Sequence, residues 1–392
     1  MSEILPERVT RHSDANEQLL YFTSASLLED DSRLFFISDR TGDPNIFSLD
    51  LASGEERQLT RNDAGYLKSY VYFDGAPYRG LGKASISLDP KRGVVYYIQG
   101  REILKVDGDG TTVVLARYPE GQMTAFTHVS SDGRRLCVPT VDARALESSL
   151  RPDGKPEIDV DARIQAEGLA SYLRVYDTET GEAIVTERVE RCWITHVQFS
   201  PVRNERILYN HEWPATDWGI RRMWLFDGGE HRRLRTAGGD RSRDDFVCHE
   251  MWERDGEAII YHGSFGWKTP FIGRVTPDGS EPAELALPTA CDRYGHFTAG
   301  APGVLVSDGY YEEPGDLDTY GGDWISRLRI DWAAGTVDWK PLCRNRSSWS
   351  SQDAHPHPIA DHATRYVYFT SDREGKRAVY RVSLDAGVRG SR

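Results

Sequence analysis

The stretch SSQDAHPHP, residues 350–358, concentrates side chains that can bind a metal ion. His355 and His357 lie two positions apart, and Gln352 precedes the first of them by three. Imidazole nitrogens and an amide oxygen suit divalent ions such as Mn²⁺, Fe²⁺ or Zn²⁺. On an extended backbone two such histidines point the same way, and the proline after each stiffens the segment. The pattern predicts a metal site, with a surface histidine pair that binds no metal as the alternative.

Short strands separated by glycine turns make up most of the chain and must position these side chains. The motifs SDRTGDPNIF (38–47) and SDREGKRAVY (371–380) are related copies, each set between alternating apolar strands. Further turns recur at similar intervals, at Gly54, Gly110, Gly181, Gly229, Gly279, Gly335 and Gly387. Four short antiparallel strands repeated seven times predict an all-β chain folded as a seven-bladed β-propeller.

Two segments depart from this repeat. Residues 143–168 lengthen the third unit and contain a helical pattern, so we expect a short helical insertion there. The N-terminal segment is expected to supply a strand that closes the ring against the last blade and removes an open sheet edge. We therefore expect residues 1–392 to form a single domain.

The propeller gives the other histidines a common location. One histidine precedes the first turn of each of blades three to seven, and so lies near the start of an innermost strand: His128, His196, His249, His296 and His357. We expect these five to form a partial ring around one mouth of the central channel, with His296 as a further metal ligand. The alternative is that related repeats share a structural histidine.

Composition limits the classes of partner and the compartment. The net charge of −13 argues against nucleic acid or an anionic membrane as a partner, because both need a basic surface. No apolar run reaches membrane-spanning length, and the N-terminus carries charges from its third residue. The five cysteines are widely spaced and odd in number, which disfavours a disulfide framework. We expect a cytoplasmic protein of unspecified oligomeric state.

Several longer motifs resemble one family across essentially the whole chain. They are DARIQAEGLASYLRVYDTETG (161–181), NHEWPATDWGIRRMWLFD (210–227), VCHEMWERDG (247–256), YGHFTAG (294–300) and SQDAHPHP (351–358). With them the chain resembles the oligogalacturonate lyases, propeller enzymes that act on short galacturonides.

The resemblance implies a role for particular residues. A divalent ion, most often taken to be Mn²⁺, would be held by His296, Gln352, His355 and His357. His249 matches the catalytic base of the family and Arg222 the arginine that binds the substrate carboxylate. Trp213 and Arg221 depart from the family pattern, which leaves the sugar contacts open. His211 is expected either to bind substrate or to brace its loop, and Arg221 either to contact substrate or to form a surface ion pair.

The implied chemistry is consistent with these residue types. β-Elimination from a uronide removes a weakly acidic proton next to a carboxylate, so a metal ion and an arginine must neutralise that carboxylate. A neutral histidine is a suitable base at cytoplasmic pH. The sequence thus predicts a carbon–oxygen lyase acting on short oligogalacturonides. The alternatives are a non-catalytic propeller that binds sugar or protein, and a metal-dependent hydrolase. His12, His231, His262 and His362 are expected to have only surface or packing roles.

Overall fold

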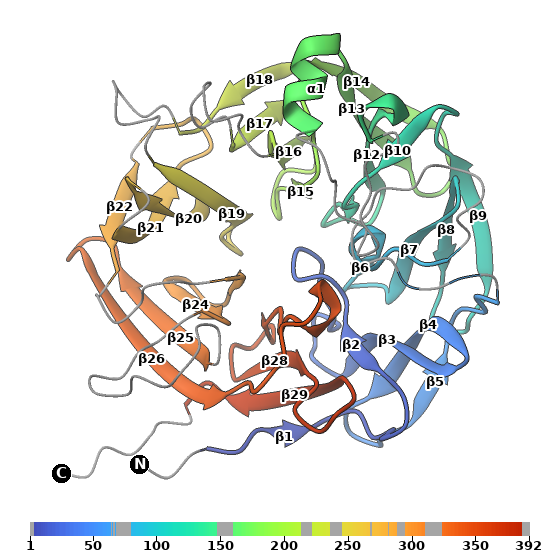
Figure 1. Cartoon of the computed structure of the whole chain (residues 1–392), viewed down its shortest axis with the longest axis vertical. Helices are drawn as coiled ribbons and strands as arrows, with labels where there is room; N and C mark the ends of the chain where they lie inside the picture. The colour runs from blue at the N-terminus through green and yellow to red at the C-terminus, as the bar shows by residue number, and fades with distance from the viewer. Residues whose placement is uncertain are drawn as a thin grey trace.

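The computed structural model describes residues 4–63, 65, 67, 80–146, 160–212, 222–235, 245–266, 269–280, 282–287, 295–309 and 324–385. Seven antiparallel sheets are arranged in a ring around a central channel (Figure 1). The predicted seven-bladed β-propeller is therefore confirmed.

The first three blades follow one another in chain order. Blade one contains β2 (Glu17–Leu19), β3 (Arg33–Thr41), β4 (Asp43–Asp50) and β5 (Glu56–Gln58). Blade two contains β6 (Ser87–Asp89), β7 (Val94–Gln99), β8 (Glu102–Val106) and β9 (Thr112–Arg117). In blade three the inner strand is divided into β10 (Gln122–Thr124) and β11 (His128–Val129), followed by β12 (Arg135–Asp142), β13 (Ala170–Asp177) and β14 (Ala183–Glu190).

The next three blades have four strands each. Blade four contains β15 (Val197–Phe199), β16 (Arg206–Tyr209), β17 (Trp224–Asp227) and β18 (Glu230–Arg233). Blade five contains β19 (Phe246–Trp252), β20 (Ile259–Phe265), β21 (Thr269–Val275) and β22 (Ala283–Ala286). Blade six contains β23 (Phe297–Ala299), β24 (Val304–Ser307), β25 (Trp324–Asp331) and β26 (Thr336–Arg344).

The last blade combines the two ends of the chain. It contains β27 (Ile359–Ala360), β28 (Tyr366–Ser371) and β29 (Ala378–Ser383), and β1 (Glu7–Arg8) pairs with β29 as its outermost strand. The backbone N–H of Val9 extends this pairing by donating to the carbonyl of Val379 at 2.8 Å. The ring is thus closed by an N-terminal strand, as predicted.

The recurring glycines mark the outer hairpins of blades one to six. Gly54, for example, lies between β4 and β5, with a φ of 76°. The other described turn glycines lie at the same place, between third and fourth strands, and also have positive φ: Gly110, Gly181, Gly229, Gly279 and Gly335. This left-handed conformation is unfavourable for residues with a Cβ atom, which explains why the repeat is marked by glycine. Gly387 lies outside the described residues.

The apolar core lies between neighbouring blades. In β3, Leu34 and Phe36 pack into one apolar cluster, whereas the alternate residues Phe35 and Ile37 pack into another. Because both faces of this blade are covered, its strand is an almost continuous apolar run. In blade three, the 3-10 helix Ala143–Leu146 and helix α1 (Val160–Glu167) lie between β12 and β13.

The loop after β2 occupies the middle of the ring (Figure 1). Its side chains Tyr21 and Phe22 are buried, and their rings contact those of histidines from several blades. This loop therefore lies across the inside of the channel and forms a floor there. In the described part of the chain, no helix is long and apolar enough to cross a membrane.

Candidate metal centre and active site

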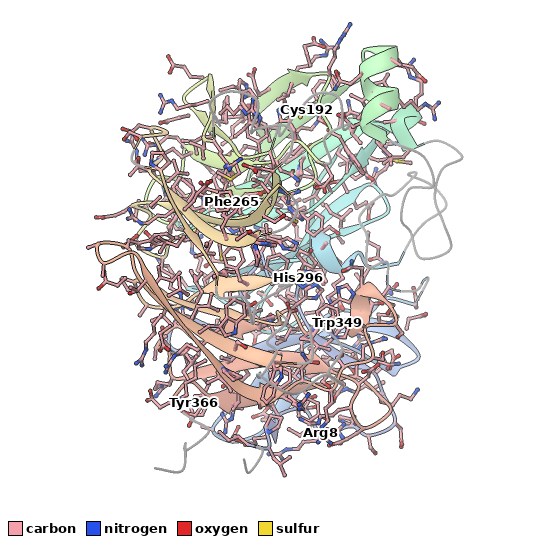
Figure 2. All side chains as sticks on the ribbon, turned by 60° about the vertical axis from the view of Figure 1, so that its left-hand side comes forward. Arg8, Cys192, Phe265, His296, Trp349 and Tyr366 are labelled. Carbon is pink, nitrogen blue, oxygen red and sulfur yellow. The ribbon has the colours of Figure 1, made fainter. Side chains whose placement is uncertain are left out.

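Three of the predicted metal ligands meet at one mouth of the channel. His296 precedes β23, while His355 and His357 lie between the 3-10 helix Gln352–Ala354 and β27 in the neighbouring blade. One nitrogen from each of the three rings lies within 4.8 Å of the others. The ring centroids of His296 and His357 are 4.1 Å apart. The ring of Trp349 is stacked with that of His296 at a centroid distance of 6.5 Å, and both residues are labelled in Figure 2.

The backbone at His357 is not extended, contrary to the expectation from its spacing. His357 has a φ of 45°. Its N–H donates to Asp308 Oδ2 at 3.2 Å, and the carbonyl of Pro356 accepts from the N–H of Thr370 at 2.9 Å. These bonds hold the left-handed turn, and the two histidines converge on His296 through this turn rather than through strand alternation.

The residues of this cluster fit a divalent metal ion. His357 Nε2 is buried and has no hydrogen-bond partner among the described residues, which is costly for a polar atom unless a ligand satisfies it. His296 Nδ1 faces Asp308 Oδ2 at 3.0 Å, so the carboxylate orients the ring and leaves Nε2 for a metal. Burial lowers the pKa of His296 and of His357, which keeps both in the neutral form that coordination requires.

Two further residues border this cluster. Gln352 begins the 3-10 helix directly before His355, and its carbonyl accepts the His355 N–H at 3.4 Å. Coordination by its side chain stays a prediction. Lys83, from the 3-10 helix Lys83–Ser85, is buried and places Nζ 3.3 Å from His357 Nδ1. Burial lowers the pKa of Lys83 to about 8.

The predicted base, His249, lies beside the metal-type cluster. Its ring centroid is 4.8 Å from that of His296. The register of β19 against β20 shifts between Cys248 and Glu250, so His249 is the extra residue of a β-bulge, with a φ of 42°. Burial lowers the pKa of His249 to about 4, and the positive charge of Arg222 adds to this effect. The imidazole is therefore neutral at neutral pH.

The predicted substrate arginine is held in a buried network. Arg222 Nε donates to Glu250 Oε2 at 2.6 Å, and Nη1 donates to Glu212 Oε1 at 3.3 Å. Its Nη2 lies 2.9 Å from Nδ1 of His196. The ring of His196 is in turn 6.4 Å from that of His249. The network links Arg222 to the base and fixes the direction of the guanidinium group.

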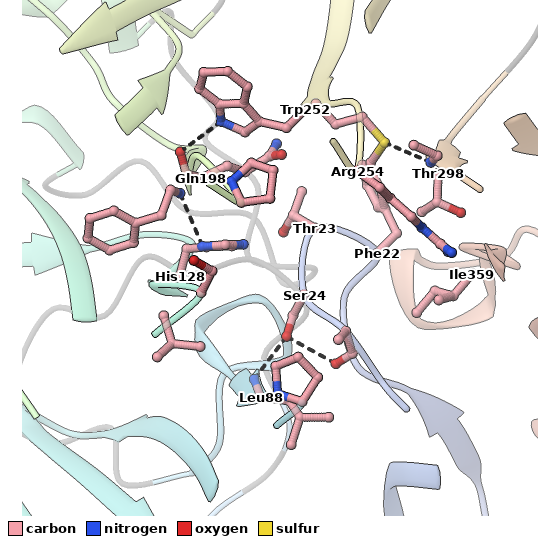
Figure 3. A pocket seen from close by; sticks show the side chains of 18 of the residues that line it. Phe22, Thr23, Ser24, Leu88, His128, Gln198, Trp252, Arg254, Thr298 and Ile359 are labelled. Atoms are coloured by element: carbon pink, nitrogen blue, oxygen red, sulfur yellow. Dashed lines mark hydrogen bonds between the residues drawn. The ribbon is translucent and has the colours of Figure 1, made fainter. Parts of the chain in front are cut away.

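One histidine of the predicted ring lies elsewhere, which corrects the expectation of five at one mouth. His128 accepts the backbone N–H of Phe199 at its Nδ1, at 3.1 Å. It lines a cavity of about 250 Å³ together with Trp252, Arg254 and Thr298 (Figure 3). The inner strand of blade three is divided before His128. In place of His128, the ring of Phe126 packs edge-on against that of His196, with the ring centroids 4.3 Å apart.

The predicted sugar-binding residues come from the loop between β16 and β17. His211 stacks on Trp224, with ring centroids 4.8 Å apart and planes 16° apart. This contact braces the loop beside Glu212. Trp213 and Arg221 lie outside the described residues.

Residue patterns alone did not identify several members of the site. Glu212, Glu250 and Asp308 bind Arg222 and His296, and His262 contacts His249, although only packing or surface roles were expected for His262. A signal for His262 was present, because a β19–β20 hairpin brings it opposite Cys248. Lys83 comes from a segment that is distant from His357 in the sequence, so no local pattern indicated its place in the site.

These features define a propeller protein with a buried, histidine-rich polar site at one channel mouth, suited to a divalent ion and to proton transfer. Comparison with known proteins assigns the family. The model of the oligogalacturonate lyase family matches residues 5–388. The chain belongs to this family.

Individual relatives are similar over nearly their whole length. An oligogalacturonide lyase of Pectobacterium atrosepticum is 26% identical over 384 residues, covering 94% of this chain and 90% of the relative. An oligogalacturonate lyase of Dickeya dadantii is 24% identical over the same shares. A solved oligogalacturonate lyase in complex with manganese has a TM-score of 0.75 at 23% identity, covering 96% of this chain and 92% of that chain. That structural likeness supports the fold.

Proposed function

We propose that this protein is a metal-dependent lyase that cleaves short oligogalacturonides by β-elimination. Membership of the oligogalacturonate lyase family supports the reaction class. The observation that carries the proposal is a half-buried, neutral imidazole, His249, whose ring centroid lies 4.8 Å from that of His296 in the metal-type cluster. A propeller that only binds sugar or protein has no need for a base beside a metal site.

The proposed metal is Mn²⁺, held by His296, His355 and His357 with Gln352 as a further ligand. One relative was solved in complex with manganese, and the imidazole-rich ligand set suits this ion. When bound, the ion would supply positive charge opposite the substrate carboxylate and so make the neighbouring C5 proton more acidic.

His249 and Arg222 would carry out the remaining work. Arg222, fixed by Glu250 and Glu212, orients the uronate carboxylate. His249 accepts the C5 proton, the C5–H electron pair forms the C4–C5 double bond, and the C4–O4 bond breaks. The departing sugar oxygen takes up a proton, and the other product carries a 4,5-unsaturated uronate end. No oxidant or reductant is required.

Sugar binding is proposed for the loop between β16 and β17, through His211, Trp213 and Arg221. Trp349 offers an aromatic face beside the metal-type cluster, where its ring centroid lies 4.6 Å from that of His355. Nucleic acid is not a proposed partner, given the net charge of −13.

The proposed compartment is the cytoplasm. Cys137 and Cys248 are free thiols, as expected in a reducing compartment, and Cys291 lies outside the described residues.

Ultraviolet absorbance of conjugated unsaturated uronates tests the function. Protein stripped with a chelator and resupplied with Mn²⁺ is incubated with saturated digalacturonate and trigalacturonate. We expect absorbance to rise with Mn²⁺ and not with the stripped protein. An unchanged absorbance in the Mn²⁺-loaded sample, at enzyme concentrations that bind the sugar, would favour the binding propeller instead.

A further inference from the structure

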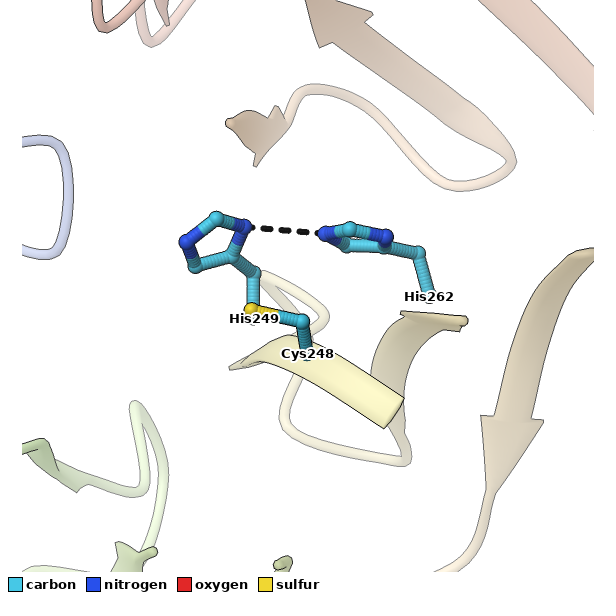
Figure 4. Close-up of side chains that lie close together, drawn as sticks. All are labelled: Cys248, His249 and His262. Carbon is cyan, nitrogen blue, oxygen red and sulfur yellow. Dashed lines mark hydrogen bonds between the residues drawn. The ribbon is translucent and has the colours of Figure 1, made fainter. Parts of the chain in front are cut away.

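A second histidine lies directly behind the proposed base. His262 is in β20, where its Cα atom is paired with that of Cys248 across the β19–β20 ladder. The bulge after Cys248 turns the ring of His249 toward His262, and the two ring centroids are 5.0 Å apart. His262 is buried, with 4% of its surface exposed. Figure 4 shows the two rings joined by a hydrogen bond from nitrogen to nitrogen.

Two groups converge on the same nitrogen of His249. Its Nδ1 is 3.0 Å from the carbonyl oxygen of Gly295 and 2.9 Å from His262 Nε2. A carbonyl oxygen can only accept a hydrogen bond, so the proton of the neutral His249 ring is on Nδ1. His262 Nε2 must then present its lone pair, because two N–H groups cannot face each other at this distance.

This arrangement leaves His249 Nε2 unprotonated and pointing away from His262 (Figure 4). We propose that His262 is a positioning residue: with the Gly295 carbonyl it holds the Nδ1–H of His249, so that the lone pair on Nε2 is available as the base. This proposal rests on the proposed function. Two acceptors on Nδ1–H fix the tautomer and the ring orientation, and they stabilise the imidazolium that forms when Nε2 takes the C5 proton.

Loss of the acceptor should therefore slow the chemical step without altering substrate binding. His262→Phe keeps a ring beside Phe297, whose centroid is 5.7 Å away, but removes the acceptor. His262→Gln restores an oxygen acceptor. Second-layer contacts of this kind change activity by about 10–100-fold. His128→Gln is the matched control, because His128 is a histidine at the inner strands that lies outside the site.

Steady-state kinetics with Mn²⁺ and trigalacturonate distinguish a positioning role of His262 from a packing role. We expect His262→Phe to lower kcat by about 10–100-fold with KM changed by less than about twofold and metal content unchanged. His262→Gln should recover most of kcat, and His128→Gln should match the parent protein. A normal kcat in His262→Phe, or a Gln variant no faster than the Phe variant, would overturn the role of His262.

A spectroscopic reading of the unaltered protein keeps the test valid if a variant fails to fold. In histidine-selectively ¹⁵N-labelled protein loaded with diamagnetic Zn²⁺, His249 is assigned by comparison with His249→Gln. We expect a protonated Nδ1 and an unprotonated Nε2, and the opposite tautomer would refute the proposal. Absence of elimination by the parent protein would refute the function instead, whatever the tautomer.

Discussion

Arg222 offers less positive charge to a ligand than an arginine without carboxylate partners would. Its guanidinium is bonded to the carboxylates of Glu212 and Glu250, and both partners are buried with it. In the proposed mechanism, an incoming uronate therefore meets an oriented donor whose positive charge is more than offset by two carboxylates. Most of the charge that neutralises the substrate carboxylate would then come from the bound metal, whose candidate ligand His296 lies beside the base.

At the residue scale, the variant His249→Gln tests the role of the base separately from that of the metal site. Because His249 is not one of the clustered ligands His296, His355 and His357, the variant should keep its metal. General-base catalysis contributes at least about 100-fold, so elimination should fall by that factor or more. Metal content is measured by mass spectrometry and rate by absorbance.

The double variant His355→Ala/His357→Ala should lose both metal and activity, and full metal occupancy in it would show that the ligand set is wrong.

At the element scale, closure of the ring depends on a short N-terminal strand. Val9 is buried against the last blade, whereas the ion pair of Glu7 with Arg381 is exposed. Removing residues 1–10 exposes the edge of β29 and the apolar contacts of Val9. We expect the melting temperature to fall by at least about 5 °C, with aggregation through the open edge.

Glu7→Gln is the control for this truncation. It keeps the strand and loses only an exposed ion pair, worth less than about 1 kcal/mol. Its melting temperature should therefore stay close to that of the parent protein. An unchanged melting temperature in the truncated protein would mean that β1 does not stabilise the ring.

The elements of this fold are also what the sequence predicts best. Turn glycines such as Gly54 and Gly279 need positive φ, so their recurrence reveals the outer hairpins directly. His296 and His357 were found because their blades repeat the same position. The expected place of His128 in the histidine ring was wrong because the inner strand of blade three is divided, a change that the repeat does not record. Lys83 could not be found, since its contact with His357 depends on packing between distant segments. Asp308 faces His296 across the β23–β24 hairpin, but no residue pattern singled it out.

At the scale of the whole molecule, the channel has two different ends. The histidine cluster lies at the starts of the inner strands, and the cavity lined by His128 and Arg254 lies at their ends, with Phe22 between them. Phe22 stacks on His357 on one side and lines the cavity on the other. The floor formed by this loop keeps the reactive mouth separate from the far end of the channel.

Histidines that are shielded from water and neutral in the folded state make stability depend on pH. Burial lowers the pKa of His128 to about 4, while the unfolded chain has the ordinary value of about 6.5. Between these values the unfolded state binds more protons, so stability is full above about pH 6.5 and falls as pH decreases toward about 4.

His128→Gln should reduce this dependence while still accepting the N–H of Phe199. The difference in unfolding free energy between pH 7 and about pH 4.5 should shrink by about 2–3 kcal/mol. Urea denaturation at both pH values measures it. An identical pH dependence in the variant would show that His128 is not protonated on unfolding in this range.

In the proposed mechanism, one channel mouth brings both the metal and the base to the same uronate. The most direct test is a crystal structure of His249→Gln soaked with Mn²⁺ and digalacturonate, with anomalous diffraction at the manganese edge. We expect an anomalous peak among His296, His355 and His357, the uronate carboxylate on that ion, and C5 facing residue 249. A peak at Cys248 and His262, or sugar in the cavity beside Arg254, would show that the metal and the base do not act together at this mouth.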